Sequence, residues 1–148
     1  MKGQNFSFMK EMVTHIISGR KIITNRIATP FRQKLEVGGI MHLFTGMRTP
    51  NCKKIGTAKV LDKVYWHKKH MVTKVNYKYE ESPLTNVTWE QFSWIDGFDD
   101  YKYFYVYFQN RKAKADELGF VCYKFKFSIA RQWYIGTPEE SKTLRWLK

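Results

Sequence analysis

Residues 18–26 are Ser18-Gly19-Arg20-Lys21-Ile22-Ile23-Thr24-Asn25-Arg26, and within them the periodicity of the chain changes. Before this stretch, apolar residues recur at the spacing of one face of a short helix. They are Met9, Met12, Val13, Ile16 and Ile17. Gly19 follows the last of them, where a glycine ends a helix in the left-handed conformation without a steric penalty. After it the period becomes two, so Thr24 and Arg26 share one face of a predicted strand that begins at Lys21.

This succession of helix, Gly-Arg-Lys and Thr-x-Arg strand resembles the opening of the ASCH domains, small β-barrels of the PUA-like superfamily that are linked to RNA. Downstream, Phe92-Ser93-Trp94-Ile95-Asp96-Gly97-Phe98 is similar to the short helix and acidic-Gly-Phe turn that precede a further helix in these domains. The aromatic strand expected at 120–127 is similar to the one that closes them. The resemblance covers residues 6–127. It implies an α+β fold, a PUA-like (ASCH) mixed β-barrel of about five to six strands with flanking helices.

The composition is that of a folded and strongly basic domain. A chain of 148 residues can bury a core, and we assign residues 1–128 to the ASCH domain and 129–148 to a C-terminal extension packed on it. Hydrophobic residues make up 43% and aromatic residues 17%, which excludes a disordered chain. The 26 Lys and Arg outnumber the 13 Asp and Glu, giving a net charge of +13. This charge favours phosphate backbones or anionic surfaces as partners, although it could also serve only solubility.

Several function classes are not expected from the sequence. A membrane span is not predicted, because the chain has no run of about 18 apolar residues. The first residues lack an apolar signal core, so we expect a cytoplasmic protein. Cys52 and Cys122 form neither a disulfide framework nor a metal-ligand cluster, and free thiols are expected. We therefore predict no metal and no cofactor.

The remaining elements follow from local patterns. Pro30 and the charged residues around it predict a loop over 28–37 that leads into a glycine turn. A long strand is predicted at 55–66, and a second one at 71–79 would pair with it as a hairpin. Residues 88–96 have a helix start signal at Thr88, and a further helix capped by Asp99 is predicted from Tyr101. The aromatic residues of that second helix recur at helical spacing, although their types favour a strand.

The resemblance also implies candidate catalytic residues. ASCH proteins that hydrolyse acetylated cytidine have a lysine after the glycine, a threonine three residues on and a distant acid; the matching positions are Lys21, Thr24 and Asp96. A threonine hydroxyl needs a neighbouring base, and a lysine desolvated in a pocket can lose its proton and act as one. The chain departs from the pattern in two places, since Ile22 stands where these enzymes commonly have threonine and the acid is Asp instead of Glu. The same side chains could line an anion or base pocket without turnover.

A second set of residues is a candidate for binding nucleic acid. Arg20, Lys21 and Arg26 would place fixed cations beside the cleft. The Gly- and Pro-containing loop 45–54 and the basic cluster 67–70 are expected to attract phosphates. Both segments are also typical of simple hairpin loops.

An aromatic side chain near these cations would provide a stacking plane for an unpaired base, and Trp66 and Trp94 are the candidates. The complete set of candidate nucleic-acid-binding residues is Arg20, Lys21, Arg26, Arg48, Lys53, Lys54, Trp66, Lys68 and Lys69.

We interpret the chain as an ASCH domain that binds RNA, another single-stranded nucleic acid or a modified nucleoside or nucleotide in a basic cleft. One alternative is an amidohydrolase acting on acylated pyrimidine nucleosides such as acetylcytidine. Another is a small basic protein that docks on an acidic host protein, and the small size and basicity would suit a phage protein.

Overall fold

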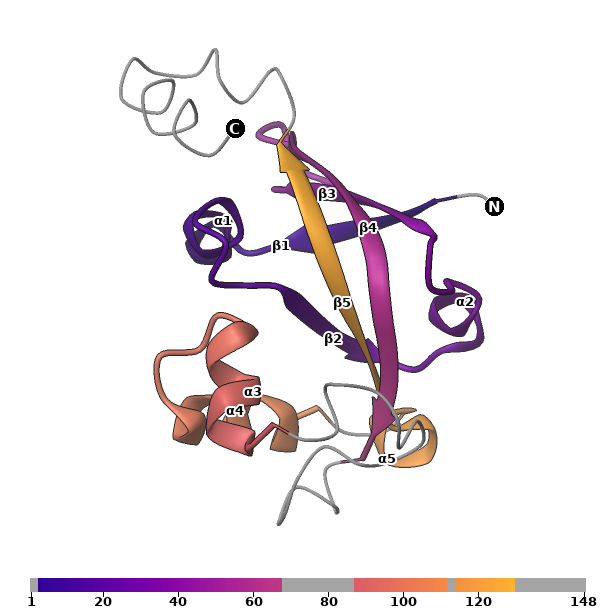
Figure 1. Ribbon diagram of the computed structural model, residues 1–148, viewed down its shortest axis with the longest axis vertical. Helices are drawn as coiled ribbons and strands as arrows, with labels where there is room; N and C mark the ends of the chain where they lie inside the picture. The colour runs from indigo at the N-terminus through magenta and orange to yellow at the C-terminus, as the bar shows by residue number, and fades with distance from the viewer. Residues whose placement is uncertain (1–2, 68–86, 112–113, 130–148) are drawn as a thin grey trace.

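A computed structural model describes residues 3–67, 87–111 and 114–129 (Figure 1). Its elements are β1 (Gln4–Phe8), α1 (Lys10–Ile17), β2 (Ile23–Ile27), α2 (Pro30–Gln33), β3 (Ile40–Thr45), β4 (Lys53–Trp66), α3 (Trp89–Ile95), α4 (Tyr101–Gln109), α5 (Lys114–Leu118) and β5 (Phe120–Ile129). The predicted strand at 71–79, the cations Lys68 and Lys69, and all of the C-terminal extension after Ile129 lie outside the described residues.

The five described strands form one mixed sheet in the order β1-β3-β4-β5-β2. β1 pairs with β3 in parallel, and the other pairs are antiparallel. β4 is long, and a register shift between Val60 and Asp62 interrupts its pairing with β5. The sheet curls into a half-barrel whose two edge strands are β1 and β2. The predicted α+β fold with a mixed barrel-like sheet is confirmed.

Apolar side chains are buried on both faces of the sheet where β4 and β5 pair. Successive residues of a strand point to opposite faces, so Val121 and Tyr123 join a core with β1, α1 and β3. Phe120 and Cys122 join a second core with α3 and α4. Trp66 is the centre of this second core, and its ring centroid lies 4.5 Å from Phe120, 5.2 Å from Phe108 and 5.4 Å from Trp89.

The connection from α1 to β2 follows the predicted glycine cap. Gly19 has a φ of 84°, which is the left-handed conformation expected of it. The strand begins at Ile23, however, and not at Lys21. The reason is that the backbone N–H of Lys21 donates to His15 in α1 and that of Ile22 donates to Ile95 in α3. Lys21 is therefore held between two helices before the strand begins.

The two predicted helices after residue 87 are both present. Thr88 and Gln91 form a reciprocal capping box at the start of α3. The side chain of Asp100, not of Asp99 as predicted, caps α4 by accepting from the N–H of Lys102 at 2.8 Å. The helical spacing prevailed over strand propensity because it places Phe104 against the rings of the second core.

The predicted loop over residues 28–37 contains a short helix, α2. Thr29 caps it by accepting from the backbone N–H of Arg32 at 3.2 Å, and Pro30 occupies the first helical position. A proline is favoured there, because the N–H that it lacks has no partner within a helix. The expected glycine turn follows, with Gly38 at a φ of 89°. This helix places the side chain of Arg32 beside β1.

Candidate functional site

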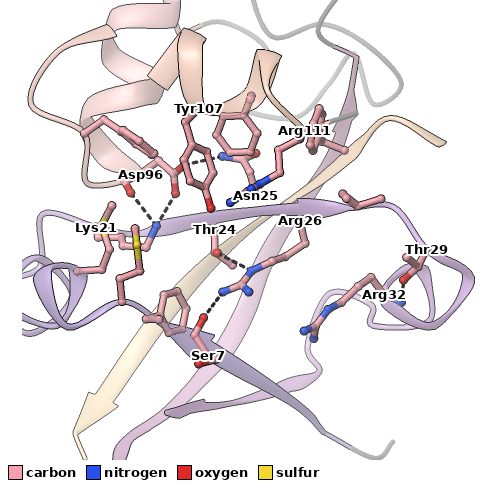
Figure 2. Close-up of a pocket in the computed structure, with 17 residues that line it drawn as sticks. Ser7, Lys21, Thr24, Asn25, Arg26, Thr29, Arg32, Asp96, Tyr107 and Arg111 are labelled. Carbon is pink, nitrogen blue, oxygen red and sulfur yellow. Dashed lines mark hydrogen bonds and ion pairs between the residues drawn. The ribbon is translucent and has the colours of Figure 1, made fainter. Parts of the chain in front are cut away.

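A cavity of about 350 Å³ lies between the edge strands β1 and β2 and beneath α4 (Figure 2). All three predicted catalytic residues, Lys21, Thr24 and Asp96, line it. The residues around them are Ser7, Phe8, Met9, Met12, Asn25, Arg26, Ile27, Thr29, Arg32, Phe98, Tyr107, Phe108, Arg111 and Phe120. We call the open side of the sheet between its edge strands β1 (Gln4–Phe8) and β2 (Ile23–Ile27) the seam. The seam and the end of α3 bring together residues that are far apart in sequence.

Lys21 and Asp96 form a buried ion pair at one end of the cavity. The Lys21 Nζ donates to the backbone oxygen of Asp96 at 2.7 Å and also to its carboxylate. The two residues are only 4% and 2% exposed. Asp96 is the C-cap of α3, so the same residue offers both a fixed carbonyl and a carboxylate to the ammonium group. Removing either partner would leave an uncompensated charge in the protein interior.

Burial has opposite effects on the two members of this pair. It lowers the pKa of the Lys21 ammonium group, against the attraction of Asp96. It raises the pKa of the Asp96 carboxyl, against the attraction of Lys21 and the hydrogen bond from Asn25. Desolvation therefore favours the neutral form of each group, while their contact favours the charged forms. Burial therefore makes loss of the Lys21 proton easier than for an exposed lysine.

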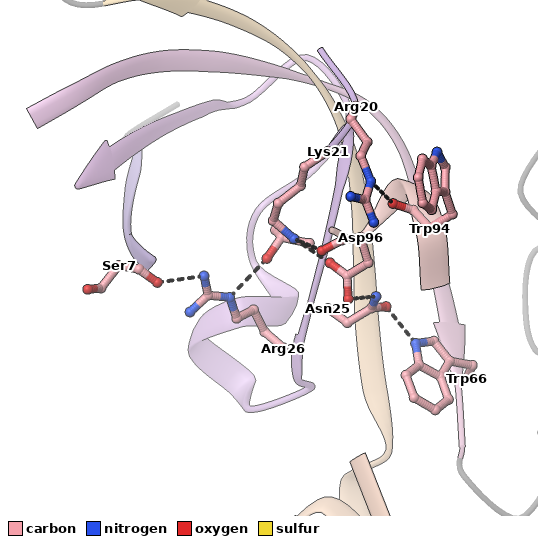
Figure 3. A network of polar contacts seen from close by, with 9 residues as sticks. Ser7, Arg20, Lys21, Asn25, Arg26, Trp66, Trp94 and Asp96 are labelled. Atoms are coloured by element: carbon pink, nitrogen blue, oxygen red, sulfur yellow. Dashed lines mark hydrogen bonds and ion pairs between the residues drawn. The ribbon is translucent and has the colours of Figure 1, made fainter. Parts of the chain in front are cut away.

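Asn25 extends the ion pair into the aromatic core (Figure 3). Its Nδ2 donates to the Asp96 carboxylate at 3.1 Å, and its Oδ1 accepts from the Trp66 indole N–H at 2.7 Å. The prediction that Trp66 offers a stacking plane is wrong, because Trp66 is 1% exposed and packed on all sides by rings. Sequence reasoning missed Asn25, although a buried indole N–H needs an acceptor and Asn25 is the polar residue of that strand face.

Arg26 crosses the seam between the two edge strands. Its Nε donates to Thr24 Oγ1 at 3.2 Å, and its Nη2 donates to the backbone oxygen of Ser7 in β1 at 2.9 Å (Figure 2). Burial, and then the nearby Arg32 guanidinium, lower the pKa of Arg26 to about 10. The side chain is therefore still a cation at neutral pH. As predicted, it shares the cavity with Thr24.

Arg32 reaches the same edge strand from α2. Its Nη1 donates to the backbone oxygen of Asn5 at 3.0 Å and to the Gln4 side chain at 3.2 Å. Burial lowers the pKa of Arg32 as well. The guanidinium carbons of Arg32 and Arg26 lie 4.0 and 5.2 Å from the centroid of the Phe6 ring. Arg32 was not among the predicted site residues, because its position depends on a four-residue helix that the sequence predicted to be a loop.

Two further cavity residues, Tyr107 on α4 and Arg111 just after it, were also missed. Arg111 lies with its guanidinium carbon 4.0 Å from the centroid of the Tyr107 ring, and both residues line the cavity. Their spacing of four residues along and just beyond α4 puts them on one helix face. The helical prediction for this segment could therefore have included them.

Arg20 and Trp94 form a separate surface contact outside the cavity lining. The Arg20 guanidinium lies 3.5 Å above the Trp94 ring, donates to the Trp94 backbone oxygen and pairs with Asp99 at 2.7 Å. The hydrogen bond and charge of Arg20 lower the pKa of the exposed Asp99 carboxyl. Trp94 is 51% exposed, so a ring face remains available beside this cation.

The predicted basic loop lies in the β3–β4 hairpin. Arg48 and Lys53 are exposed, and Lys54 is half-buried with its Nζ 3.4 Å from His42 Nδ1. None of the three lines the cavity. These three cations therefore lie apart from Arg26 and Arg32, and the sequence did not predict that separation.

The metal-ligating side chains and thiols of the described residues are not clustered. Within the described ranges, no three His, Cys, Asp or Glu residues lie close enough together to hold a metal ion. Cys52 is exposed and Cys122 is buried, and burial raises the pKa of the Cys122 thiol. No helix in the described part of the chain is long and apolar enough to cross a membrane.

Comparison with known proteins agrees with this architecture. No protein-family model and no curated protein matches the chain. Among solved structures, the ASCH protein from Zymomonas mobilis is similar with a TM-score of 0.53 and 13% identity over 97% of this chain and 94% of that one. The hypothetical protein PH0355 is similar with a TM-score of 0.54 and 20% identity over 86% and 100% of the two chains. Protein EF3133 from Enterococcus faecalis V583 is similar with a TM-score of 0.52 and 13% identity over 87% and 81%. The order of motifs predicted an ASCH domain, and the chain has the ASCH fold.

Proposed function

We propose that the chain binds RNA by accepting one unpaired nucleotide, or a free modified nucleotide, in the cavity between β1 and β2. The observation that carries this proposal is the pairing of Arg26 and Arg32. Both are cations held beside the cavity by neutral acceptors, namely backbone carbonyls, a threonine hydroxyl and a glutamine amide. The one carboxylate among the cavity's described lining residues, Asp96, is already paired with Lys21. An anionic ligand would supply the missing negative charge.

The cavity offers apolar side chains for a base and cations for a phosphate. Rings and thioethers from Phe8, Met12, Phe98 and Tyr107 line it together with the arginines. Stacking of a base on an aromatic ring contributes about 1–3 kcal/mol and does not depend strongly on base identity. Arg26 on β2 and Arg32 on α2 supply the guanidinium groups, so the base would pack on the rings while the phosphate would contact the arginines. A volume of about 350 Å³ is at the small end of the range for ligand sites.

The net charge of +13 would attract RNA from a distance, independently of this fit. Single-stranded RNA is the favoured class, because splayed bases of unpaired segments can enter a pocket while stacked bases of a duplex cannot. Trp94, exposed beside Arg20, offers a stacking face for a neighbouring base.

Fluorescence anisotropy with a short single-stranded RNA tests the proposal. Arg26→Gln keeps a polar side chain but removes the charge, and we expect it to weaken binding roughly 10- to 100-fold. Lys59→Gln is the matched control, because Lys59 is an exposed cation of β4 outside the cavity. Equal losses in the two variants, or no binding by the unmodified chain at low salt, would overturn the proposal. Thermal unfolding of each variant shows whether it is folded.

A second function is favoured by the meeting of Lys21, Thr24 and Asp96 in one cavity. In an amidohydrolase, Thr24 Oγ1 would attack the acyl carbon of an acylated nucleoside, and the amine would leave with a proton. Water would then cleave the acyl-threonine ester. Arg26 Nε already donates to Thr24 Oγ1, which favours the ionised hydroxyl, whereas Lys21 would have to leave Asp96 to act as the base.

Incubation with acetylcytidine tests this second function. Release of acetate and cytidine that is abolished by both Thr24→Val and Lys21→Met would support it, because a nucleophile and its base act as one unit. Absence of turnover by the unmodified chain would exclude this substrate and leave the binding proposal unaffected.

A further inference from the structure

We infer that the cavity takes a nucleotide with a terminal phosphate monoester, either the end of an RNA or a free nucleoside monophosphate, in preference to an internal phosphodiester. This inference rests on the proposed function and specifies its ligand. Three features of the seam between β1 and β2 support it: the uncompensated charge, the free guanidinium N–H groups and the closure of the seam.

The first feature is the amount of positive charge. Arg26 and Arg32 both line the cavity, while Lys21 and Asp96 offset each other. Arg26 and Arg32 are close enough to repel, since the charge of Arg32 disfavours the charged form of Arg26. A phosphodiester carries one negative charge, whereas a monoester carries about −1.5 to −2 at pH 7. The monoester therefore offsets more of the positive charge of the arginines that line the cavity.

The second feature is the supply of hydrogen-bond donors. The hydrogen bonds of Arg26 use its Nε and Nη2, and those of Arg32 use its Nη1. Among the described residues, Nη1 of Arg26 and Nη2 of Arg32 have no partner. Both guanidinium groups are anchored on β1, so these remaining donors are held in place before a ligand arrives. A monoester offers three strong acceptor oxygens to such donors, and a diester offers only two non-bridging oxygens.

The third feature is the closure of the seam. Arg26 joins β2 to Ser7, and Arg32 joins α2 to Asn5, two residues earlier on the same edge strand. Alternate carbonyls of an edge strand point the same way, so the two bridges lie side by side along β1. An internal nucleotide needs two exits for the chain, and these bridges obstruct the side of the cavity towards β1. A terminal nucleotide needs one exit, and a free nucleotide needs none.

Competition against a labelled RNA tests the inference. The competitors are one short RNA sequence with a 5′-hydroxyl, a 5′-phosphate, a 3′-phosphate or a 5′-methyl phosphate, together with the free nucleoside monophosphates. The methyl phosphate is the matched control, because it keeps the phosphorus and removes the second charge. We expect a monoester at one end to bind roughly 10- to 100-fold more tightly than the hydroxyl and methyl phosphate forms. Arg26→Gln and Arg32→Gln should each reduce that ratio, and Lys59→Gln should leave it unchanged.

The outcomes separate this inference from the proposed function. Equal binding of the hydroxyl, methyl phosphate and phosphate forms would overturn the inference, while Arg26-dependent binding of all of them would still support the proposed function. No Arg26-dependent binding of any form would overturn both. Strong competition by a nucleoside monophosphate identifies the free nucleotide as the source of the monoester, and competition only by phosphorylated RNA identifies an RNA end.

Discussion

Two basic regions of this molecule use their cations differently. At the seam, Arg26 and Arg32 are half-buried, and each donates to a carbonyl of β1. In the β3–β4 hairpin, Arg48 is exposed on a turn that contains glycine and proline, Lys53 is exposed at the start of β4, and Lys54 is half-buried. The first region holds its charges at fixed positions, whereas Arg48 and Lys53 of the second are exposed to solvent. Fixed donors can recognise the shape of an anion, while exposed cations mainly attract it and are screened by salt.

The same contrast extends to folding. The seam is continuous with the buried chain of contacts from Lys21 through Asp96 and Asn25 to Trp66. Among the described residues, Arg48 takes part in no such chain of buried contacts. A change at the seam should therefore affect stability and binding together, and a change in the hairpin should affect only long-range attraction.

Asp96→Ala should cause the largest change. It leaves the Lys21 ammonium buried without its partner, and breaking a buried pair in this way costs about 3–5 kcal/mol of unfolding free energy. Burial without a counter-charge lowers the pKa of Lys21 further, so the folded variant releases the proton more readily than the unfolded one. The deficit is then greatest at pH values below the lysine's folded pKa and shrinks as pH rises towards its unfolded pKa. Urea unfolding at several pH values measures it.

Lys53→Ala is the control for that measurement, with an expected change within about 0.5 kcal/mol. Replacing both members of the pair, as in Lys21→Met with Asp96→Leu, should recover part of the lost stability because no buried charge remains. If Asp96→Ala costs no more than Lys53→Ala, the ion pair is not part of the folded core and the contrast fails.

The next effect concerns affinity for single-stranded RNA at high salt. Arg26→Gln should weaken binding by about 1.5–3 kcal/mol at both low and high salt, as expected for hydrogen bonds to a charged group. The combined change of Arg48, Lys53 and Lys54 to Gln should weaken binding at low salt only, because exposed charges are screened. Anisotropy titrations across a salt series compare the two variants. If the loss of RNA affinity in Arg26→Gln vanishes at high salt, Arg26 acts only by long-range electrostatic attraction, as the hairpin cations are expected to do.

Part of this contrast was predictable from the sequence. The change of period around Gly19 predicted the helix and the strand, and the family resemblance placed Lys21, Thr24 and Asp96 in one site. Helical spacing identified α4 despite its strand-like composition. These predictions succeeded because each depends on local spacing or on a motif order that a related fold preserves.

The remaining features depend on non-local contacts. The carbonyls of Asn5 and Ser7 are available only because β1 pairs with β3 along one side and leaves its other side at the seam. Trp66 is buried by α3 and α4, which follow it in the chain, and strand periodicity does not reveal which face later helices will cover. Arg32 depends on the brief helix α2, where one threonine cap and one proline determine the geometry.

A smaller effect is expected in the salt dependence itself. With roughly four to six phosphate contacts on a single strand, the logarithm of affinity should fall with the logarithm of salt at a slope of about −3 to −4. Replacing the three hairpin cations by Gln should flatten this slope by about one to two units. Arg26→Gln should change the slope by less than one unit while lowering affinity throughout. A hairpin variant with an unchanged slope would show that these cations do not approach the RNA.

The smallest effect is expected from modifying the hairpin thiol. Cys52 is exposed beside Lys53, whereas Cys122 is buried in β5 and burial raises its thiol pKa, so little reactive thiolate forms there. A methanethiosulfonate reagent should therefore modify Cys52 in the folded chain and Cys122 only after denaturation, which mass spectrometry can count. A neutral adduct on Cys52 should change RNA affinity within about twofold, as for an ordinary surface substitution. An anionic adduct at the same atom should weaken binding at low salt and not at high salt, because it opposes only the screened attraction of the hairpin. If the neutral adduct alone abolishes binding, the hairpin contacts the ligand directly, and the division between a fixed seam and an attractive hairpin is wrong.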